Sequence, residues 1–497
     1  MITKIPKQVI EVLRKIEASG FEAYIVGGCV RDLIMDRVPK DWDVATNAKP
    51  AEVQSLFPDS FYENEFGTVG VKVEPFMVNG NAGREHDVIE VTTYRIESKY
   101  SDKRRPDTVE FAKTLAEDLS RRDFTMNAVA LRVSHIVNRI SQNDPRFEIV
   151  DLYNGQDDIK NKVIRTVGNP AERFDEDALR MMRAIRFHAE LGFAIEKDTF
   201  EAIQRCAADL HHVALERIKD ELTKIILSDN PAEGVEMLHQ TGMLEYVMPE
   251  LEKGVGVAQN RHHVYTIYQH SILALKHCPS KKLEVRLASL LHDIAKPQTK
   301  RGEGEFATFY NHDHVGARVA EKILTRLKFS NEVIQKVKLL VDQHMFYYNP
   351  EEVGDASVRR LIKKVGLENM KDLIDVRIAD RLGSGVAKAK PYKLRHLEYV
   401  IDKVSTDAVS VKMLKLNGSD LMKELEVKPG PIIGAVLDVL LSEVIEDATK
   451  NKHEDLLGRA KELCVMDLAK LREMAKEKIE EKKEEDDEEI KKKHWVK

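Results

Sequence analysis

Cysteine is scarce in this chain, which has four cysteines among its 497 residues. They stand at positions 29, 206, 278 and 464 and form no Cys-x-x-Cys pair, so the sequence indicates neither a disulfide framework nor a thiolate zinc site. An excess of positive charge is also lacking, since 78 basic and 84 acidic residues give a formal net charge of −6. Contacts with nucleic acid would therefore have to come from local basic patches.

Long hydrophobic runs are missing as well. No segment approaches the roughly 20 apolar residues that cross a bilayer, and the amphipathic start of the chain has no signal-peptide pattern. We therefore expect no membrane partner and a location in the reducing cytoplasm. The length predicts about three domains, because a chain of 497 residues is too long for one hydrophobic core.

Secondary-structure signals change along the chain. A helix pattern over residues 1–20 is followed by short β-rich runs such as EAYIVGG, WDVAT, TVGVKVEPF and HDVIEVTTYRI, and VNGNAG between the last two predicts a hairpin. After Asp151 helical periodicity takes over, and segments such as DEDALRMMRAIRFHAELG (175–192) predict helices. We predict an α+β protein, in which a small α/β head with a mixed sheet precedes an all-α body.

Two interruptions of the helical pattern suggest further boundaries, at EKGVGVAQNRHHVY and at KLNGSDLMKELEVKPGPIIG. The predicted segments are a head over 1–140, a helical domain over 141–255, a second helical domain over 256–400, a C-terminal helical segment over 401–469 and a charged tail over 470–497. The tail is low in complexity and has no hydrophobic face, so we expect a solvated helix that frays into disorder. Its acidic and basic residues nearly cancel, which disfavours RNA binding.

The stretch VGGCVRDLIMDRVPKDWDVAT, from Val26 to Thr46, carries the first chemical signal. A strand that ends in Gly27-Gly28 and continues into a helix makes a tight turn, whose backbone N–H groups are able to approach phosphate oxygens. Arg31 adds a fork of donors. The sequence therefore predicts a phosphate-binding turn.

Asp41 and Asp43 follow on the next predicted strand, two residues apart, and so point to the same face. Two carboxylates beside a phosphate cradle suit Mg²⁺, and such a pair is able to hold two ions for phosphoryl transfer. Glu90 is the best candidate for a third carboxylate from a neighbouring strand, with Asp87 as its competitor. The alternative is that the glycines form an ordinary loop and the aspartates lie on the surface.

This pattern resembles the signature of class II nucleotidyltransferases, the family of CCA-adding tRNA nucleotidyltransferases and bacterial poly(A) polymerases. Further matching segments follow in order: RRDFTMNAVA (121–130), DLYNGQDDIKNKVIRTVG (151–168), EDALRMMRAIRF (176–187), VALERIKDEL (213–222) and VKPGPIIGAVLDVLL (427–441). The resemblance covers roughly residues 5–465 and implies a polymerase-beta-like head, a base-recognising and RNA-binding domain over 141–255, and RNA binding by 401–469. Asp36, where the family often has a turn glycine, is a departure that we expect to change only the turn.

The resemblance also implies how bases are chosen. Cytosine and adenine both present an amino donor beside a ring acceptor, whereas uracil and guanine reverse these positions, so an Asp acceptor next to an Arg donor selects C and A. Carried over, this places Asp177 and Arg180 on the base edge. The remaining nucleotide-binding positions that the resemblance implies are Gly27, Gly28, Arg31, Arg122, Asp123, Asn127, Arg183 and Arg186. From spacing alone, the alternative is a solvated stripe in which Asp177 pairs with Arg180.

A basic segment, YRIESKYSDKRRPDTVEF, contains the predicted RNA-binding residues Lys99, Lys103, Arg104 and Arg105. In CCA-adding relatives the matching loop helps the switch from C to A addition. The alternative is an ordinary mobile surface loop. We expect tRNA to lie along a local basic surface that this loop and Arg121-Arg122 line on one side.

A second constellation consists of His270, His292, Asp293, His312, His344 and Asp380. An adjacent His-Asp pair on an otherwise apolar helix is costly to bury without a cation, and His and Asp ligands suit a divalent transition metal. The order H…HD…H…H…D resembles the HD phosphohydrolase superfamily, so residues 256–400 are predicted to be an all-α HD domain. His312 is preferred to His314 as a ligand. The alternative is a structural or RNA-docking element with a vestigial metal.

Together these features imply template-independent addition of C, C and A to the 3′ end of tRNA from CTP and ATP, with Mg²⁺ at Asp41 and Asp43. A poly(A) polymerase, or an enzyme that adds only A or only CC, is the alternative within the same chemistry. An HD phosphohydrolase with a vestigial nucleotidyltransferase domain is the alternative from another class. The sequence does not predict an oligomeric state.

Overall fold

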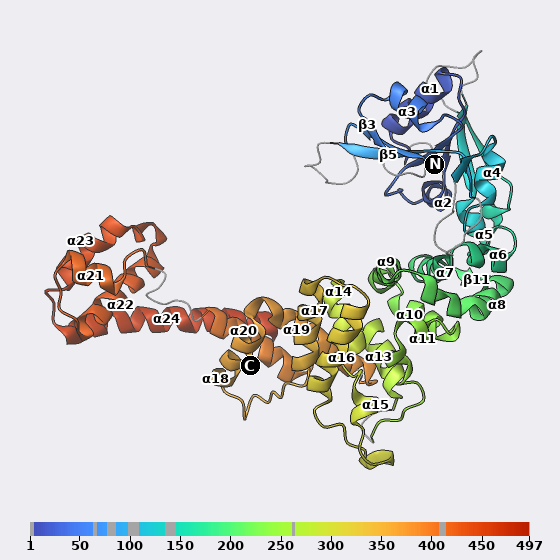
Figure 1. The fold of residues 1–497 in the computed structure, drawn as a ribbon. Coiled ribbons are helices and arrows are strands. Elements are labelled where there is room, and N and C mark those ends of the chain that lie inside the picture. Colours follow the sequence, from blue (N-terminus) through green and yellow to red (C-terminus); the bar gives the residue numbers. More distant parts are fainter. Residues whose placement is uncertain are drawn as a thin grey trace. The chain divides into compact units, whose positions relative to one another are not determined.

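The computed structural model describes residues 4–62, 67–76, 86–97, 109–134, 146–260, 264–386, 388–406 and 414–496. The chain divides into two compact units, Met1–Val341 and Asp342–Lys497. Figure 1 labels the elements of both. Each unit is described by itself.

The head of the first unit contains a seven-stranded sheet in the order β3-β4-β5-β2-β1-β8-β9. These strands are β1 (Ala23–Val26), β2 (Asp43–Thr46), β3 (Ser60–Tyr62), β4 (Thr68–Val73), β5 (Asp87–Thr93), β8 (Val129–Ser134) and β9 (Arg146–Asp151). The pairing of β2 with β5 is parallel and the other pairings are antiparallel. The predicted mixed sheet is therefore confirmed.

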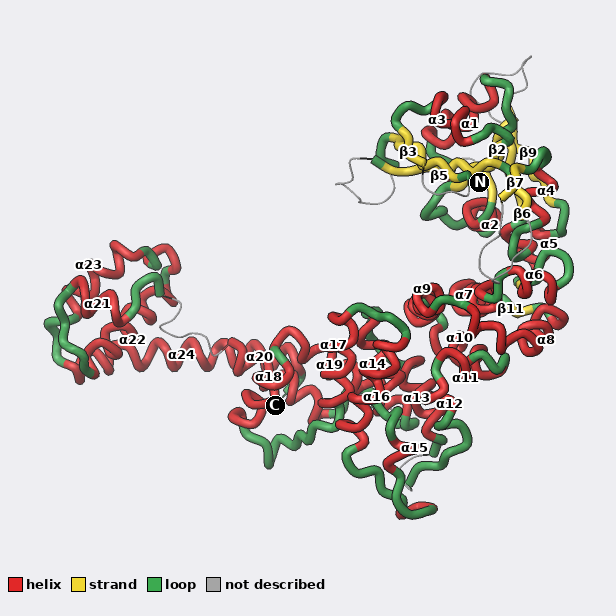
Figure 2. The backbone as a smooth tube through the Cα atoms, in the orientation of Figure 1, coloured by secondary structure: helices red, strands yellow, loops and turns green. Residues whose placement is uncertain are grey.

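Both faces of the central strands are covered, which explains why β1 reads as a continuous apolar run. Ile25 belongs to a core that includes residues of α1 (Lys7–Ala18) and α3 (Pro50–Leu56), which lie together over the sheet in Figure 2. Tyr24, on the opposite face, packs with residues of α4 (Leu115–Ser120). This alternation fixes the register and therefore fixes which side chains reach the strand ends.

Two smaller predictions concern the edges of the head. The helix expected over residues 1–20 is confirmed as α1, and the chain turns away at Gly20, whose φ is +88°. β4 and β5 pair antiparallel from Thr68↔Thr92 onward, as a hairpin requires. The predicted turn VNGNAG itself lies outside the described residues.

Helices dominate after β9. Those between the head and the first unit's end are α5 (Gly155–Asn161), α6 (Pro170–Glu176), α7 (Leu179–Leu191), α8 (Lys197–Cys206), α9 (Leu215–Leu227), α10 (Pro231–Gln240), α11 (Leu244–Val247), α12 (Pro249–Glu252), α13 (Ile267–Lys276), α14 (Leu283–Leu291), α15 (Lys296–Thr299) and α16 (His312–Arg326). α17 (Asn331–Gln343) follows and reaches the boundary between the units.

The predicted helix over 175–192 is not continuous. α6 ends at Glu176, Asp177 is extended with φ −146° and ψ 104°, and α7 begins at Leu179. The Asp177 carboxylate accepts a hydrogen bond from the Leu179 backbone N–H at 3.1 Å. A short acidic side chain that bonds to nearby backbone N–H groups favours a helix start over a helix interior, which explains the break.

The second unit is built from α18 (Asp355–Val365), α19 (Leu367–Gly383), α20 (Tyr392–Thr406), α21 (Gly418–Glu424), α22 (Pro431–Glu446), α23 (His453–Leu463) and α24 (Leu468–His494). α21, α22, α23 and the start of α24 share a core around Leu416, Val436 and Leu471.

The charged tail differs from the expected disorder, because α24 continues to His494. Its far end is fastened to α20: Tyr399 donates to Asp487, and Asp402 binds Lys493 at 2.7 Å and His494 at 2.9 Å. These partners lie about 90 residues away in sequence, which is why local composition did not reveal them.

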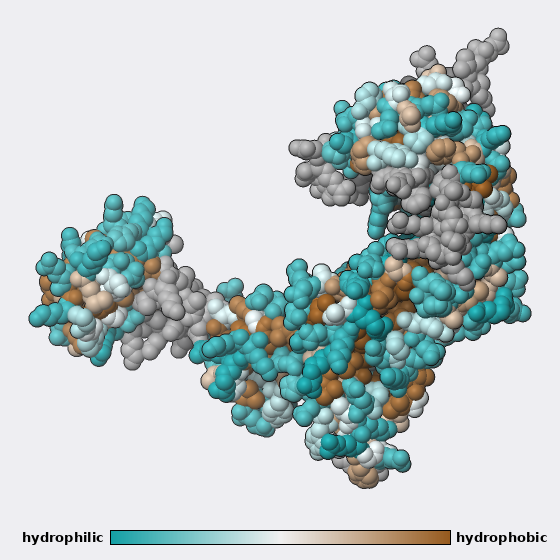
Figure 3. Space-filling model, viewed as in Figure 1, coloured by the Kyte–Doolittle hydropathy of each residue, from teal (hydrophilic) through white to brown (hydrophobic). Residues whose placement is uncertain are grey.

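Hydrophilic side chains cover most of the face that Figure 3 shows. Among the described residues, we find no helix that combines the length and the apolar character needed to cross a membrane.

Candidate active site and a buried histidine cluster

The turn between β1 and α2 (Gly28–Ile34) has the geometry that only glycine adopts readily. Gly27 has φ +80° and ψ −142°. A Cβ atom built on Gly27 would lie 3.1 Å from Arg122 Nη1 and 3.3 Å from Asp43 Oδ2. The turn, a guanidinium and a carboxylate therefore converge on one point, as the sequence predicted for Gly27 and Asp43.

The predicted carboxylates come from adjacent parallel strands. Asp43 opens β2 and stands in register with Glu90 of β5, so the two side chains share a face of the sheet. Asp41 lies two residues earlier, outside the strand and exposed. The competitor Asp87 accepts a hydrogen bond from the Phe76 backbone N–H at 2.6 Å. Glu90 is exposed, and its role as the third carboxylate stays a prediction.

A hydrogen-bonded chain of four side chains runs from α2 to α7. Arg31 donates to Asn127 at 2.9 Å, and Asn127 donates to Asp123 at 3.2 Å. Arg183 then donates to the other oxygen of Asp123 at 2.7 Å. These four predicted nucleotide-binding residues form one connected set that joins the turn to the helical body.

The charge state of Asp123, at the centre of these hydrogen bonds, is well defined. Burial raises the pKa of the Asp123 carboxyl. The Arg183 guanidinium and the Asn127 hydrogen bond lower this pKa by more than burial raises it, and the result is a pKa of about 2. Asp123 is therefore an anion at neutral pH. A buried anion with charged and neutral donors holds both neighbours in fixed positions.

The orientation of Arg122 depends on a residue that the sequence did not reveal. Asp118, 1% exposed, binds Arg121 at 2.7 Å and Arg122 at 3.1 Å. Burial raises the pKa of Asp118, and the two guanidinium groups lower it more strongly, so that it lies below its ordinary value. The only sequence signal was the spacing of three and four residues along LAEDLSRRD.

The salt-bridge alternative required Asp177 to pair with Arg180. The two side chains do not pair with each other. Asp177 instead binds Arg217 of α9 through two contacts of 2.7 and 3.2 Å. Arg180 donates to the Glu176 carboxylate, to the Arg173 carbonyl at 3.2 Å and to the Arg121 carbonyl at 3.1 Å. Arg217 was not among the predicted residues, because its partner lies 40 residues away.

Arg186, the last predicted nucleotide-binding residue on α7, makes its contacts within the protein. It binds Glu221 of α9 at 2.9 Å, and its guanidinium lies 4.1 Å from the Phe187 ring centre. Burial lowers the pKa of Arg186. The predicted RNA-binding residues Lys99, Lys103, Arg104 and Arg105 lie outside the described residues.

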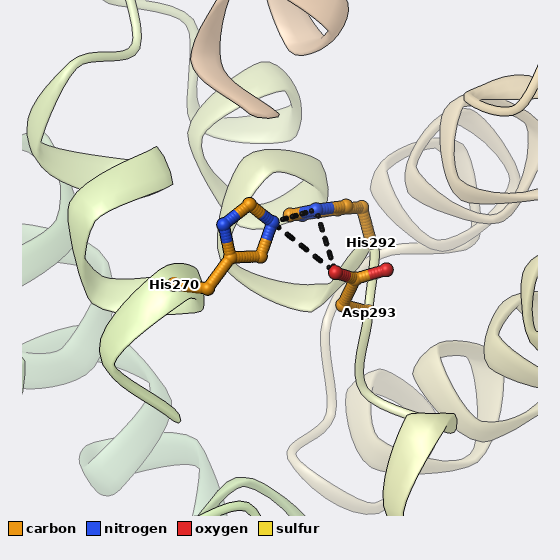
Figure 4. Close-up of side chains that lie close together, drawn as sticks. All are labelled: His270, His292 and Asp293. Atoms are coloured by element: carbon orange, nitrogen blue, oxygen red, sulfur yellow. Dashed lines mark hydrogen bonds and ion pairs between the residues drawn. The ribbon is translucent and has the colours of Figure 1, made fainter. Parts of the chain in front are cut away.

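The second constellation begins with three buried side chains, His270 of α13 and the His292-Asp293 pair that follows α14. Figure 4 shows them turned toward one another. The Nε2 atoms of the two histidines are 2.9 Å apart, and Asp293 Oδ2 lies 3.1 Å from that of His270 and 3.3 Å from that of His292. These three residues form a potential metal-binding group.

His312 also reaches this cluster, with Nε2 at 3.3 Å from Asp293 Oδ1, whereas His314 is exposed. Backbone carbonyls determine the tautomers. His292 Nδ1 donates to Ser289 at 2.8 Å and His312 Nδ1 donates to Phe309 at 2.7 Å. In the neutral rings the Nε2 atoms facing Asp293 therefore carry lone pairs, which is the arrangement of histidine metal ligands.

A lysine shares the cluster. Lys296 Nζ lies 2.6 Å from Asp293 Oδ2 and 2.8 Å from Gln259 Oε1. Burial raises the pKa of Asp293, but His292 and Lys296 hold it well below its usual range. His344 is buried and Asp380 binds Arg377 at 2.9 Å within the second unit. Their part in a metal site stays a prediction.

A mixed sheet with acidic residues at a glycine turn, followed by a helical body that presents Asp177 and Arg180, is the arrangement expected of a nucleotidyltransferase, and family models agree. Residues 23–165 match the poly A polymerase head domain, residues 192–254 the probable RNA and SrmB-binding site of polymerase A, and residues 305–460 the putative tRNA nucleotidyltransferase domain 2.

Similar proteins specify the family. The CCA-adding enzyme of Enterococcus faecalis is 33% identical over 477 residues, covering 93% of this chain and 97% of the relative. That of Lactiplantibacillus plantarum is 34% identical over 452 residues, covering 90% and 94%. The Bacillus stearothermophilus CCA-adding enzyme, solved in complex with CTP, matches with a TM-score of 0.57 and 26% identity, covering 92% of this chain and 96% of that one.

The chain belongs to the family of CCA-adding enzymes, which are tRNA nucleotidyltransferases. The predicted family, fold class and enzyme class are thereby confirmed. The assignment of residues 256–400 as an HD domain stays a prediction.

Proposed function

We propose that this protein adds C, C and A in turn to the 3′ end of tRNA, using CTP and ATP and no nucleic-acid template. The observation that carries the proposal is the convergence at Gly27, where Asp43 Oδ2 and Arg122 Nη1 approach the same point. This convergence places a carboxylate suited to metal binding beside a cation suited to phosphate binding. The relatives that share this chain's length and family support it further.

In the proposed reaction the RNA 3′-hydroxyl oxygen forms a bond with the α-phosphorus of the nucleotide. The bond from that phosphorus to the bridging oxygen of the β-phosphate breaks, pyrophosphate leaves, and the hydroxyl proton passes to solvent. Arg122, held by Asp118, and the Gly27 turn bind the phosphates through N–H donors.

Carboxylates are the hard oxygen ligands that Mg²⁺ prefers, and Asp41 and Asp43 would hold it, with Glu90 in register beside Asp43. When bound, magnesium supplies Lewis-acid stabilisation for phosphoryl transfer. Asp177 and Arg180 would read the base, with the carboxylate accepting from the amino group that cytosine and adenine share.

The test uses three tRNA transcripts that end before CCA, after C and after CC, incubated with Mg²⁺, CTP and ATP. Sequencing of the 3′ ends should show ordered completion to CCA on all three, and no further addition. Products with only A or only CC would assign the protein to the partial tRNA nucleotidyltransferases. Long A tails on any RNA would make it a poly(A) polymerase.

The buried histidine cluster favours a second candidate function, a metal-dependent phosphohydrolase. His270, His292, Asp293 and His312 would hold a divalent transition metal, which supplies an activated water when bound. The set fits such an ion because backbone carbonyls fix the tautomers of His292 and His312.

Metal analysis of the purified protein and hydrolysis of 2′,3′-cyclic nucleotides with Mn²⁺, Co²⁺ or Ni²⁺ test this second function. The double variant His292→Ala with Asp293→Ala should lose both bound metal and hydrolysis. His314→Ala is the matched control, because His314 is 53% exposed and it is His312 that lies 3.3 Å from Asp293. Equal metal content in both variants would refute the site.

The proposed substrates also bear on location and partners. tRNA maturation with CTP and ATP would place the protein in the cytoplasm, with the tRNA 3′ end as its partner. Fractionation of cells that express the tagged chain tests this placement.

A further inference from the structure

Two opposite charges that read a base must stay apart from each other. Asp177 and Arg180 are three residues apart, the spacing at which oppositely charged side chains on a helix normally pair. A direct pair would occupy the acceptor and the donor that a base edge requires. The helix break at Asp177 removes this geometry, because α6 ends at Glu176 and α7 begins at Leu179.

Each charge also has a partner of its own. Both Nη atoms of Arg217 bind the two oxygens of Asp177, at 2.7 and 3.2 Å. Arg180 is bound on another side by Glu176, which also binds Arg173 at 2.6 Å. The side chain of Asp177 remains 17% exposed, so a ligand is still able to reach it.

We infer that Arg217 is a positioning residue that sets nucleotide selectivity, an inference that rests on the proposed function. Its two-point contact fixes the plane of the Asp177 carboxylate and holds it away from Arg180. Asp177 then accepts from the base while Arg180 donates to it. Without Arg217, the nearest guanidinium to an unpaired Asp177 is expected to be that of Arg180, and both base-reading groups are lost together.

This role predicts a specific pattern of rates. Only CTP and ATP gain from a correctly placed acceptor and donor, so only they lose when the pair collapses. In Arg217→Ala, kcat/KM for CTP and ATP should fall by about 10- to 100-fold, the size expected for lost base-edge hydrogen bonds. The rates for UTP and GTP should stay within about 2-fold of wild type, because those bases never matched the pattern.

The experiment measures single-nucleotide addition to the matching tRNA transcripts with each of the four nucleotides, on the full-length protein. Arg217→Lys, which keeps the charge but not the two-point contact, should give an intermediate loss of selectivity. Arg326→Ala is the matched control, because Arg326 makes a 2.7 Å ion pair with Glu250 at similar exposure. It should leave all four rates unchanged.

A fall of all four rates by the same factor in Arg217→Ala would overturn the inference, since that is the result of a purely structural role. If Arg217→Ala does not fold, the Arg217→Lys variant provides the test. Unchanged selectivity among the four nucleotides in Arg217→Lys would also overturn the inference. Failure of the proposed function is distinct, because then the wild-type protein itself adds no CCA.

Discussion

The Asp123 carboxylate allows a quantitative test of the buried chain between the head and α7. Replacing Asp123 with Asn keeps its shape but removes the charge that Arg183 binds at 2.7 Å. The pKa of Asp123 is about 2 against an ordinary 3.8. At 1.36 kcal/mol for each pKa unit, the folded environment favours the anion by about 2 kcal/mol. Leaving Arg183 without its anion adds to the cost, so Asp123→Asn should destabilise the head by about 2–4 kcal/mol.

Tryptophan fluorescence is a suitable assay, because the chain has two tryptophans with opposite environments. Trp42 is 2% exposed in the core of the head, whereas Trp495 is 81% exposed. Urea unfolding of the head should therefore shift the emission of Trp42 and leave that of Trp495 nearly constant. Asp59→Asn is the matched control, since Asp59 is 83% exposed and lies 3.8 Å from Lys72, and exposed pairs contribute at most about 1 kcal/mol.

The pH dependence gives an independent check. The folded-state pKa of Asp123 lies below its unfolded value, so the stabilisation is complete above about pH 4 and is lost as the pH falls toward 2. The difference between wild type and Asp123→Asn should therefore be constant from pH 7 to 5 and should shrink below pH 4. A difference under about 0.5 kcal/mol at pH 7 would refute the assigned charge state.

Other predictions concern the catalytic and histidine sites. Asp41→Ala and Asp43→Ala should each lower CTP addition by about 1,000-fold or more in a gel assay with unchanged circular dichroism, because each removes a proposed metal ligand; near-normal addition would contradict the assignment. Gly27→Ala should cost about 1–3 kcal/mol in the urea assay and raise KM for CTP, since a φ of +80° is strained for alanine and its methyl group would press on Arg122 Nη1 at 3.1 Å. His292→Ala with Asp293→Ala should leave CCA addition within about 2-fold of wild type, and a larger loss would couple the two sites. tRNA affinity measured by filter binding should fall steeply as salt rises, by about one power of concentration for each phosphate contact.

Much of the head was predictable because its signals are local. Short β-rich runs showed the strands β1 and β2, and Gly27 with Asp43 showed where they converge. The break at Asp177 was not predictable from periodicity, because buried apolar residues such as Met181 and Ile185 continue the helical pattern after it. Only the capping bond to Leu179 distinguishes a helix start from a helix interior at this position.

The supporting residues were harder to predict than the residues they support. Asp118, Arg217 and Glu221 act on partners that the motifs identified, but the contacts of Arg217 and Glu221 reach from α9 to the helix break at Asp177 and to Arg186 of α7. Pairing between elements depends on how they pack, which neither spacing nor composition encodes. His312 was predicted over His314 because the resemblance compared whole patterns, and His312 is the one that lies 3.3 Å from Asp293, although its role as a ligand stays a prediction.

The position of Lys296 has a consequence for how the protein is made. Many small zinc domains fold only when their ion is bound, because the binding free energy of the ion supplies their folding free energy. Here the ammonium group of Lys296, 2.6 Å from Asp293, already balances the buried carboxylate. We therefore expect this helical core to fold without a bound transition metal. Because of this lysine, folding of the core is expected not to depend on the cell's supply of transition-metal ions.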